Sequence, residues 1–270
     1  MNWHRILELT LFDLRCSIFR RKGLMYILPF SLFWYLVLNR FYEGAANWIQ
    51  SSDFLMLAGT KFDLDVITHL FVELPPSMSA FFILAIYTTP FFTMLAANDL
   101  FATDLGSGFF RFIISRCHRV EIFLARYLSS FLIIAICTII AAVAAALIAT
   151  FIEDYPIAIT IGYLLKIISI LILYSMPFIA GMAIISSMLN SAITAILLAA
   201  VGYVILLLGL YIAEAAFDEP ALFFYLIPSG IKKDLISMDA ASMYMALVSI
   251  PAYTLIYAWM AWTVFRRRTL

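Results

Sequence analysis

The stretch "GSGFFRFIISRCHRVEIFLARY" at residues 106–127 runs directly into "LSSFLIIAICTIIAAVAAALIAT" at residues 128–150. The first stretch mixes phenylalanine with arginine and begins with two closely spaced glycines. The second has no charged residue and exceeds the roughly 20 apolar residues that a helix needs to cross a bilayer. A charged turn followed at once by such a run predicts that the chain passes here from a membrane surface into the membrane.

The composition of the whole chain agrees with this interpretation. Of its 270 residues, 65% are hydrophobic and 13% are charged, whereas a soluble domain is about half apolar and about a quarter charged. A soluble core cannot bury so much apolar surface, so the sequence predicts an integral membrane protein. The net charge is zero, which gives no indication of a nucleic-acid partner.

Six stretches are long and apolar enough to span a membrane: about 24–41, 79–98, 120–150, 157–187, 191–213 and 242–265. No internal repeat or low-complexity linker interrupts them, so we expect one all-α transmembrane domain over residues 1–270. Before the first span, apolar side chains recur every three or four residues at Trp3, Leu7, Leu11, Leu14 and Ile18. This spacing predicts that residues 1–22 form an amphipathic helix in the membrane interface.

The distribution of lysine and arginine predicts the orientation. With both termini in the cytoplasm, the inner segments hold twelve of these residues and the outer segments hold four, namely Arg40, Lys61, Lys232 and Lys233. Residues 99–119 are then cytoplasmic, and residues 42–78 and 214–241 are extracytoplasmic. Within the last segment, "EPALFFYLIPSGIKKDL" is too apolar for a solvated loop and too broken for a span. It predicts one or two short re-entrant helices, broken at Pro228–Gly230, before the sixth span.

The loop between the second and third spans allows two interpretations. Its glycines permit a sharp turn, and "FFRFIIS" predicts a short helix with Phe109, Phe112 and Ile113 on one side. The arginines could simply flank the spans as the positive-inside rule requires, with the phenylalanines against lipid. Alternatively, the helix could dock into a soluble partner, because aromatic residues and arginine commonly anchor interfaces.

The order of these elements resembles that of type-2 ABC-transporter permeases, the membrane subunits of many bacterial exporters. The resemblance covers essentially the whole chain, from the amphipathic N-terminal helix through "LGSGFFRFIISRCHRVEIFLARYL" to the C-terminal "FRRRTL". Members commonly show an acidic residue, a glycine, a basic residue, a Ser-Arg pair and another basic residue, which match Asp104, Gly106, Arg111, Ser115–Arg116 and Arg126 here. Members often have proline before that serine, where this chain has Ile114, which predicts that the short helix runs on further.

The resemblance implies that residues 104–119 form a cytoplasmic coupling helix on which a separate P-loop ATPase docks, in two copies. The residues assigned to this contact are Asp104, Gly106, Gly108, Phe109, Arg111, Phe112, Ser115, Arg116 and Arg119. A second permease copy or a paralogue would complete a dimer in the lipid of the bacterial inner (plasma) membrane. The chain has no GxxxxGK[ST] pattern, so we expect a non-catalytic subunit without a cofactor, with ATP and Mg²⁺ bound by the partner ATPase.

Three functions fit this sequence. The first is the permease subunit of an ABC exporter. The second is a mechanotransmitter of the same architecture that moves no solute and acts on a periplasmic protein through residues 42–78 and 214–241. The third is a stand-alone secondary transporter, which the missing internal repeat disfavours.

Three residues inside the predicted spans have two interpretations each. Lys166 either lines a transport pathway or extends toward the outer surface near Glu153 or Asp154. Pro90 and Pro177 are either conformational hinges or static kinks. The three histidines and three cysteines show no ligand spacing, so we expect neither a metal site nor a disulfide.

Overall fold

The structure is a computed structural model that describes residues 3–19, 21–44, 51, 70–71, 74–216, 225, 227–237 and 240–268. Within these residues all regular structure is helical. The long helices are α2 (Arg21–Tyr42), α6 (Pro76–Ala97), α9 (Arg119–Phe151), α10 (Ile157–Met188), α11 (Ala192–Ala216) and α14 (Ala240–Arg267). The shorter elements are α1 (Trp3–Phe19), α7 (Ala102–Gly106), α8 (Phe110–Ile114), the 3-10 helix η2 (Pro228–Ile231) and α13 (Lys232–Ser237).

In the described part of the chain, six helices are long and apolar enough to cross a membrane. This confirms the prediction of an all-helical, polytopic membrane protein. The second of them starts earlier than expected, at Pro76, because proline suits the first position of a helix, where its missing N–H has no helical partner. Most of residues 42–78 and part of residues 214–241 lie outside the described residues.

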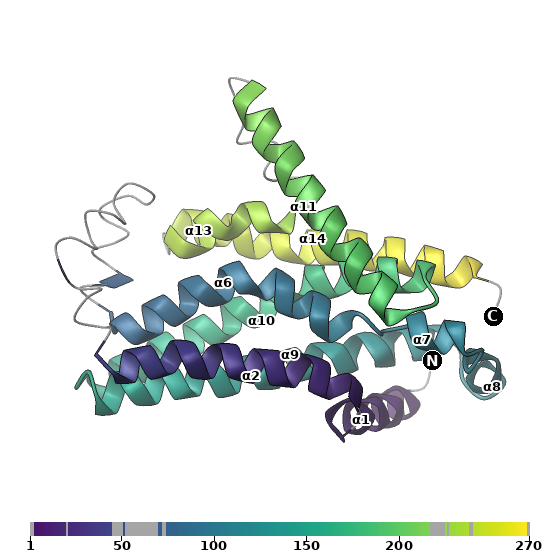
Figure 1. Cartoon of the computed structure of the whole chain (residues 1–270), viewed down its shortest axis with the longest axis horizontal. Coiled ribbons are helices and arrows are strands. Elements are labelled where there is room, and N and C mark those ends of the chain that lie inside the picture. The colour runs from purple at the N-terminus through teal and green to yellow at the C-terminus, as the bar shows by residue number, and fades with distance from the viewer. Residues whose placement is uncertain are drawn as a thin grey trace.

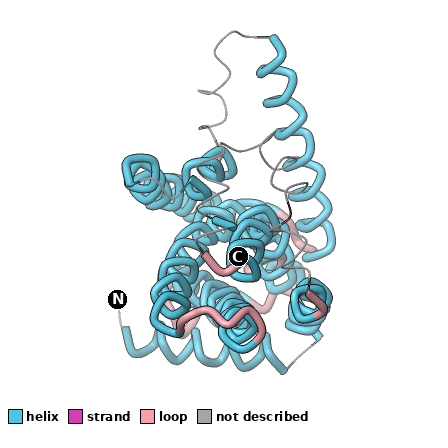
Figure 2. Tube along the Cα trace, turned by 90° about the vertical axis from the view of Figure 1, so that its left-hand side faces the viewer, coloured by secondary structure: helices cyan, strands magenta, loops and turns pink. Residues whose placement is uncertain are grey.

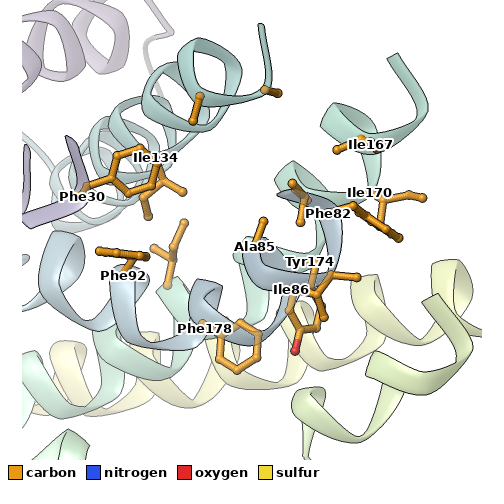
Figure 3. Close-up of a cluster of buried hydrophobic side chains, with 14 of the residues drawn as sticks. Phe30, Phe82, Ala85, Ile86, Phe92, Ile134, Ile167, Ile170, Tyr174 and Phe178 are labelled. Atoms are coloured by element: carbon orange, nitrogen blue, oxygen red, sulfur yellow. The ribbon is translucent and has the colours of Figure 1, made fainter. Parts of the chain in front are cut away.

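Helix α10 lies at the centre of the packing and contacts α6, α9 and α14. Its Ile167, Ile170 and Tyr174 are buried in one cluster with Phe82 and Ile86 of α6 (Figure 3). Helix α9 carries buried alanines at positions 141, 142, 145 and 149. Small residues let the backbones of membrane helices approach closely. The resulting van der Waals packing holds the helices together, because the hydrophobic effect does not drive their association within lipid.

Helix α11 diverges from the other long helices, as both Figure 1 and Figure 2 show. Its large apolar side chains, including Ile193, Leu197, Val204, Leu208 and Tyr211, are exposed. An apolar surface of this extent would be unfavourable in water. The exposure therefore fits a helix that is surrounded by lipid or by another membrane protein.

The two ends of the described chain lie at the same end of the bundle as α7 and α8 (Figure 1). Helix α1 crosses the bundle there and packs against α9 and α2. Gly23 permits the close packing of α1 on α2, because a side chain at this position would collide with the Ser17 carbonyl. We refer to this region, built from α1, α7, α8 and the end of α14, as the α8 end.

Candidate functional site

The turn from α6 into α8 depends on two glycines that act differently. Asp99 starts the turn, since its Oδ1 accepts the Thr103 N–H at 2.9 Å and caps α7. A side chain at Gly106 would collide with the Asn190 carbonyl, so this glycine permits a close approach to the loop between α10 and α11. Gly108 has a φ of +70°, which disfavours other residues. The predicted turn lies at Gly108, whereas Gly106 is the last residue of α7.

Two expectations about α8 were wrong. The helix ends at Ile114 and does not run on, even though proline is absent there. The helix ends because α9 starts soon afterwards. His118, the residue before α9, has an extended backbone and forms a capping box with Glu121, which prevents α8 from continuing into α9. Ile113 packs partly against the core and does not share the open side of Phe109 and Phe112.

One side of α8 is open to the surroundings. Its exposed residues, which we call the α8 ridge, are Phe109, Arg111, Phe112, Ser115 and Arg116. Phe112 is the most prominent, with 74% of its surface exposed. The Ser115 hydroxyl donates to the Phe112 carbonyl at 2.8 Å, so this serine also closes the helix. The structure thus brings five of the nine predicted coupling residues together on α8 and the residues that flank it.

The opposite side of α8 is anchored by Phe110, which is 1% exposed. Its ring lies 5.7 Å from that of Phe265 at the end of α14 and 6.3 Å from that of Phe101 before α7. Phe101 in turn stacks on Phe123 of α9 at 5.5 Å. Aromatic pairs at such distances are attractive beyond the area they bury. Phe110 was not among the predicted site residues, although it belongs to the same Phe-Phe pair as Phe109.

Three charged side chains join α1, α7 and α9. Arg126 Nε lies 3.1 Å from Asp13 Oδ2, and Arg126 Nη2 binds Asp104 Oδ2. All three side chains are less than one-fifth exposed. We call this group the Arg126 triad. A guanidinium suits this role because its planar set of N–H donors can serve two carboxylates at once. Asp104 was a predicted site residue and Arg126 matched the family pattern, but nothing in the sequence pointed to Asp13.

Helix α1 turns most of its predicted apolar face away from the bundle, as expected for a helix in the membrane interface, although Leu14 packs partly against the core. The face that packs against the bundle carries Ile6, Thr10 and Asp13, which are buried. The Thr10 hydroxyl is satisfied by the Ile6 carbonyl at 2.7 Å. Trp3, Leu7 and Leu11 lie on the open face, each more than half exposed. The apolar periodicity therefore marks a surface that is free to contact something other than this chain.

The C-terminal end of α14 is tied to the same region. Arg119 Nη1 donates to the carbonyls of Arg266 at 2.8 Å and Arg268 at 3.2 Å. Arg268 Nη2 donates to Asn190 Oδ1 at 2.7 Å. The last carbonyl groups of a helix have no partner within the helix, and the Arg119 side chain supplies hydrogen bonds to them at the end of α14. Arg119, which the sequence assigned to a partner contact, therefore has a role within the chain. A cavity of about 270 Å³ lies beside these groups and is lined by Asp104, Arg111, Asn190 and Arg268 among others.

The remaining predicted residues lie elsewhere. Lys166 is exposed on α10. The Glu153 carboxylate, one of its expected neighbours, accepts the backbone N–H and the hydroxyl of Ser77, each at 3.1 Å. Pro90 and Pro177 are buried inside the continuous helices α6 and α10. In the part of the chain that the structure describes, no three His, Cys, Asp or Glu side chains are grouped as a metal site would require.

Comparison with known proteins adds no assignment. No family model matches the chain, and no curated protein matches it.

Proposed function

We propose that this chain is the permease subunit of an ABC exporter, driven by a separate P-loop ATPase that docks on the α8 ridge. The observation that carries the proposal is the exposed Phe112, flanked by Arg111 and Arg116, on a helix whose other side is anchored. The resemblance of the element order to type-2 permeases supports the same assignment.

The chemistry of the α8 ridge suits a protein partner. Aromatic residues and arginine are enriched at the centres of interfaces, where an aromatic ring fills a pocket and arginine makes directed hydrogen bonds. Leaving Phe112 in water exposes a large apolar surface, which a groove on a partner would cover. Because Phe110 holds the helix in place, little ordering of α8 would oppose binding.

The connections of α8 explain how docking would affect the membrane helices. Phe110 links it directly to α14 and, through Phe101, to α9. The Arg126 triad links the preceding segment to α1. Gly106 allows α7 to pack closely against the loop that joins α10 and α11. When two ATPase subunits close, a displacement of α8 would pass through these contacts to several helices as a rigid-body movement.

The proposal also predicts how the helices are oriented in the bacterial inner membrane. With α8 and both termini in the cytoplasm, the open face of α1 lies in the acyl boundary of the inner leaflet. Elements η2 and α13 then form the re-entrant segment on the outer side. The exposed side of α11 would face lipid or the second permease copy of the dimer.

Co-purification tests the docking surface. The tagged chain, expressed at native level and solubilised gently, should retain a P-loop ATPase that mass spectrometry identifies. Phe112→Asp combined with Arg116→Glu should reduce the retained ATPase at least about tenfold, as expected for the loss of an interface hot spot. Arg267→Glu changes an exposed arginine outside the α8 ridge and is the matched control.

Each variant must elute as a monodisperse particle in size-exclusion chromatography, so that loss of the ATPase does not reflect misfolding. Absence of a P-loop ATPase from the wild-type preparation would contradict the proposed function. Retention of the ATPase by the double variant would instead exclude the α8 ridge as its docking site.

A further inference from the structure

A groove with a volume of about 600 Å³ lies between α2 and α9, and we call it the α2–α9 groove. All the described residues that line it belong to α1, α2 and α9. On α2 they recur at intervals of three and four positions from Ile27 to Tyr42, and on α9 they follow the same spacing from Ile133 to Ile148. Each set therefore forms one stripe along its helix. Both stripes cover about 22 Å, at about 1.5 Å per residue.

The dimensions of the α2–α9 groove fit one hydrocarbon chain and exclude a helix. Spread over about 22 Å of helix length, the volume of about 600 Å³ corresponds to a mean cross-section of about 27 Å². A helix with its side chains is about 10 Å wide, which corresponds to a cross-section of about 80 Å². A transmembrane helix of another protein is therefore too wide to enter. An extended hydrocarbon chain, whose carbon atoms pack at about 4 Å from their neighbours, has room there.

The packing of α2 explains why this space is left open. Trp34, which lines the groove, is 4% exposed and its ring centre lies 4.5 Å from that of Phe81 in α6. Such ring contacts hold α2 against α6. On the other side of the groove, Ala141 and Ala144 of α9 have side chains too short to fill the gap. The two helices thus lack close side-chain packing along this line.

The α2–α9 groove is open toward the surroundings of the bundle. Tyr35, Ile140 and Leu147 line it and are each more than half exposed. At the α8 end its lining includes Ile18, which belongs to the apolar periodicity of α1 and is itself exposed. The groove therefore continues the apolar surface of α1. Around a membrane-spanning helix the molecules that reach such a surface are lipids, and water would be unfavourable there.

We propose that the α2–α9 groove is a binding site for an acyl chain of a membrane phospholipid. The chain lies lengthwise between the two stripes. Its van der Waals contacts with both helices take the place of the packing that α2 and α9 do not make with each other. The site goes beyond the proposed export function and does not depend on it, because no ATPase and no transported substrate take part.

Photolabelling by a lipid tests the site. The purified chain is reconstituted without any ATPase into phosphatidylglycerol vesicles that contain a phosphatidylglycerol with a diazirine near the end of one palmitoyl chain. Leu38 lines the groove about 16 Å beyond Ile27. This depth is close to the middle of a hydrocarbon core about 30 Å thick, so the end of a chain from either leaflet reaches it. Mass spectrometry then measures the label at each residue.

Leu36 is the reference for Leu38, because it has the same side chain on the same helix but lies outside the groove. Leu38 is 9% exposed and Leu36 is 57% exposed. If lipid only surrounds the protein, Leu38 should carry about one-sixth of the label of Leu36, in proportion to these exposed fractions. With a chain bound in the groove, the label at Leu38 should at least equal that at Leu36.

Variants that fill the groove locate the bound chain. Ala144 follows Ile133 by 11 positions, as Leu38 follows Ile27, so the two residues lie at a similar depth. Ala144→Phe should lower the ratio of label at Leu38 to label at Leu36 to about one-sixth. Val143→Phe is the matched control and should keep the wild-type ratio, because Val143 is 39% exposed and lies outside the groove.

Ala144→Leu adds less volume than Ala144→Phe and should give an intermediate ratio, which keeps the test valid if the larger side chain prevents folding. Each variant must elute as a monodisperse particle in size-exclusion chromatography. A wild-type ratio of about one-sixth would overturn the proposal. So would a ratio that falls equally in Ala144→Phe and Val143→Phe, or that falls in none of the variants.

Discussion

Arg126 Nε lies 3.1 Å from Asp13 Oδ2, and this contact joins the N-terminal helix α1 to the long helix α9. The same guanidinium binds Asp104, which precedes the α8 ridge. The interface helix and the proposed docking helix are therefore connected through one arginine. Substitution of this arginine should lower the stability of the fold, because it leaves two carboxylates close together in a partly buried site without a compensating positive charge.

We expect Arg126→Leu to destabilise the protein by about 3 kcal/mol, the magnitude typical of breaking a buried ion pair. Arg40→Leu removes an arginine that also contacts a carboxylate at 3.1 Å, that of Glu43, but on the exposed surface. Its effect should stay within about 0.5 kcal/mol. Thermal unfolding in detergent measures both variants. Equal losses in the two would show that the Arg126 triad has no special structural role.

The two sides of α8 should respond differently to truncation. Phe110→Ala removes a buried ring from an aromatic cluster, and we expect a loss of about 3 kcal/mol in stability. Phe112→Ala should change stability by less than about 0.5 kcal/mol, because the ring is exposed. Only Phe112→Ala should weaken ATPase retention in a protein of normal stability. A Phe112→Ala variant that unfolds as readily as Phe110→Ala would contradict this division.

The two glycines of the turn should also differ. Gly106→Ala places a methyl group against the Asn190 carbonyl, so the loop between α10 and α11 must move, at a cost of about 1–3 kcal/mol. Gly108→Ala meets no atom within 4 Å but keeps a φ of +70°, which costs about 1 kcal/mol. Hydrogen exchange of residues 189–191 should rise in Gly106→Ala alone. Increased exchange in both variants would argue against a specific contact at Gly106.

Glu153 should make stability depend on pH. Burial raises the pKa of this carboxyl above its ordinary value of 4.5, and the hydrogen bonds from Ser77 oppose the shift only in part. The folded state then binds a proton more tightly than the unfolded state, so stability should fall as the pH rises from 4.5 through the raised pKa. Glu153→Gln keeps an oxygen that can accept from Ser77 and should remove this dependence.

Thermal unfolding at several pH values between 4.5 and 7 measures the effect, as the difference between wild type and Glu153→Gln. Asp154→Asn is the control, because it neutralises the neighbouring, exposed carboxylate. A difference that stays constant with pH, or that appears equally in Asp154→Asn, would contradict the assignment to Glu153.

Much of the fold could be predicted because it depends on local properties of the chain. A run of about 20 apolar residues crosses a membrane whatever surrounds it, so the six long helices could be located to within a few residues. The glycines at 106 and 108 likewise indicated a turn between the second and third of them. Local spacing also predicted a short helix with Phe109 and Phe112 on one side, whereas the position of Arg111 and Arg116 beside them was evident only in the structure.

The sequence by itself thus determined the all-helical architecture and the short amphipathic elements between spans. Only the tertiary structure decided which face of α1 packs inward, that Asp13 meets Arg126, and that Arg119 binds the end of α14. The same holds for Lys232, which a count of charges places in an outer loop and the packing places beside Tyr87. A hydrophobic run forms a spanning helix because the membrane surrounds every run with the same apolar solvent. Ion pairs and ring contacts instead depend on which helices pack next to each other.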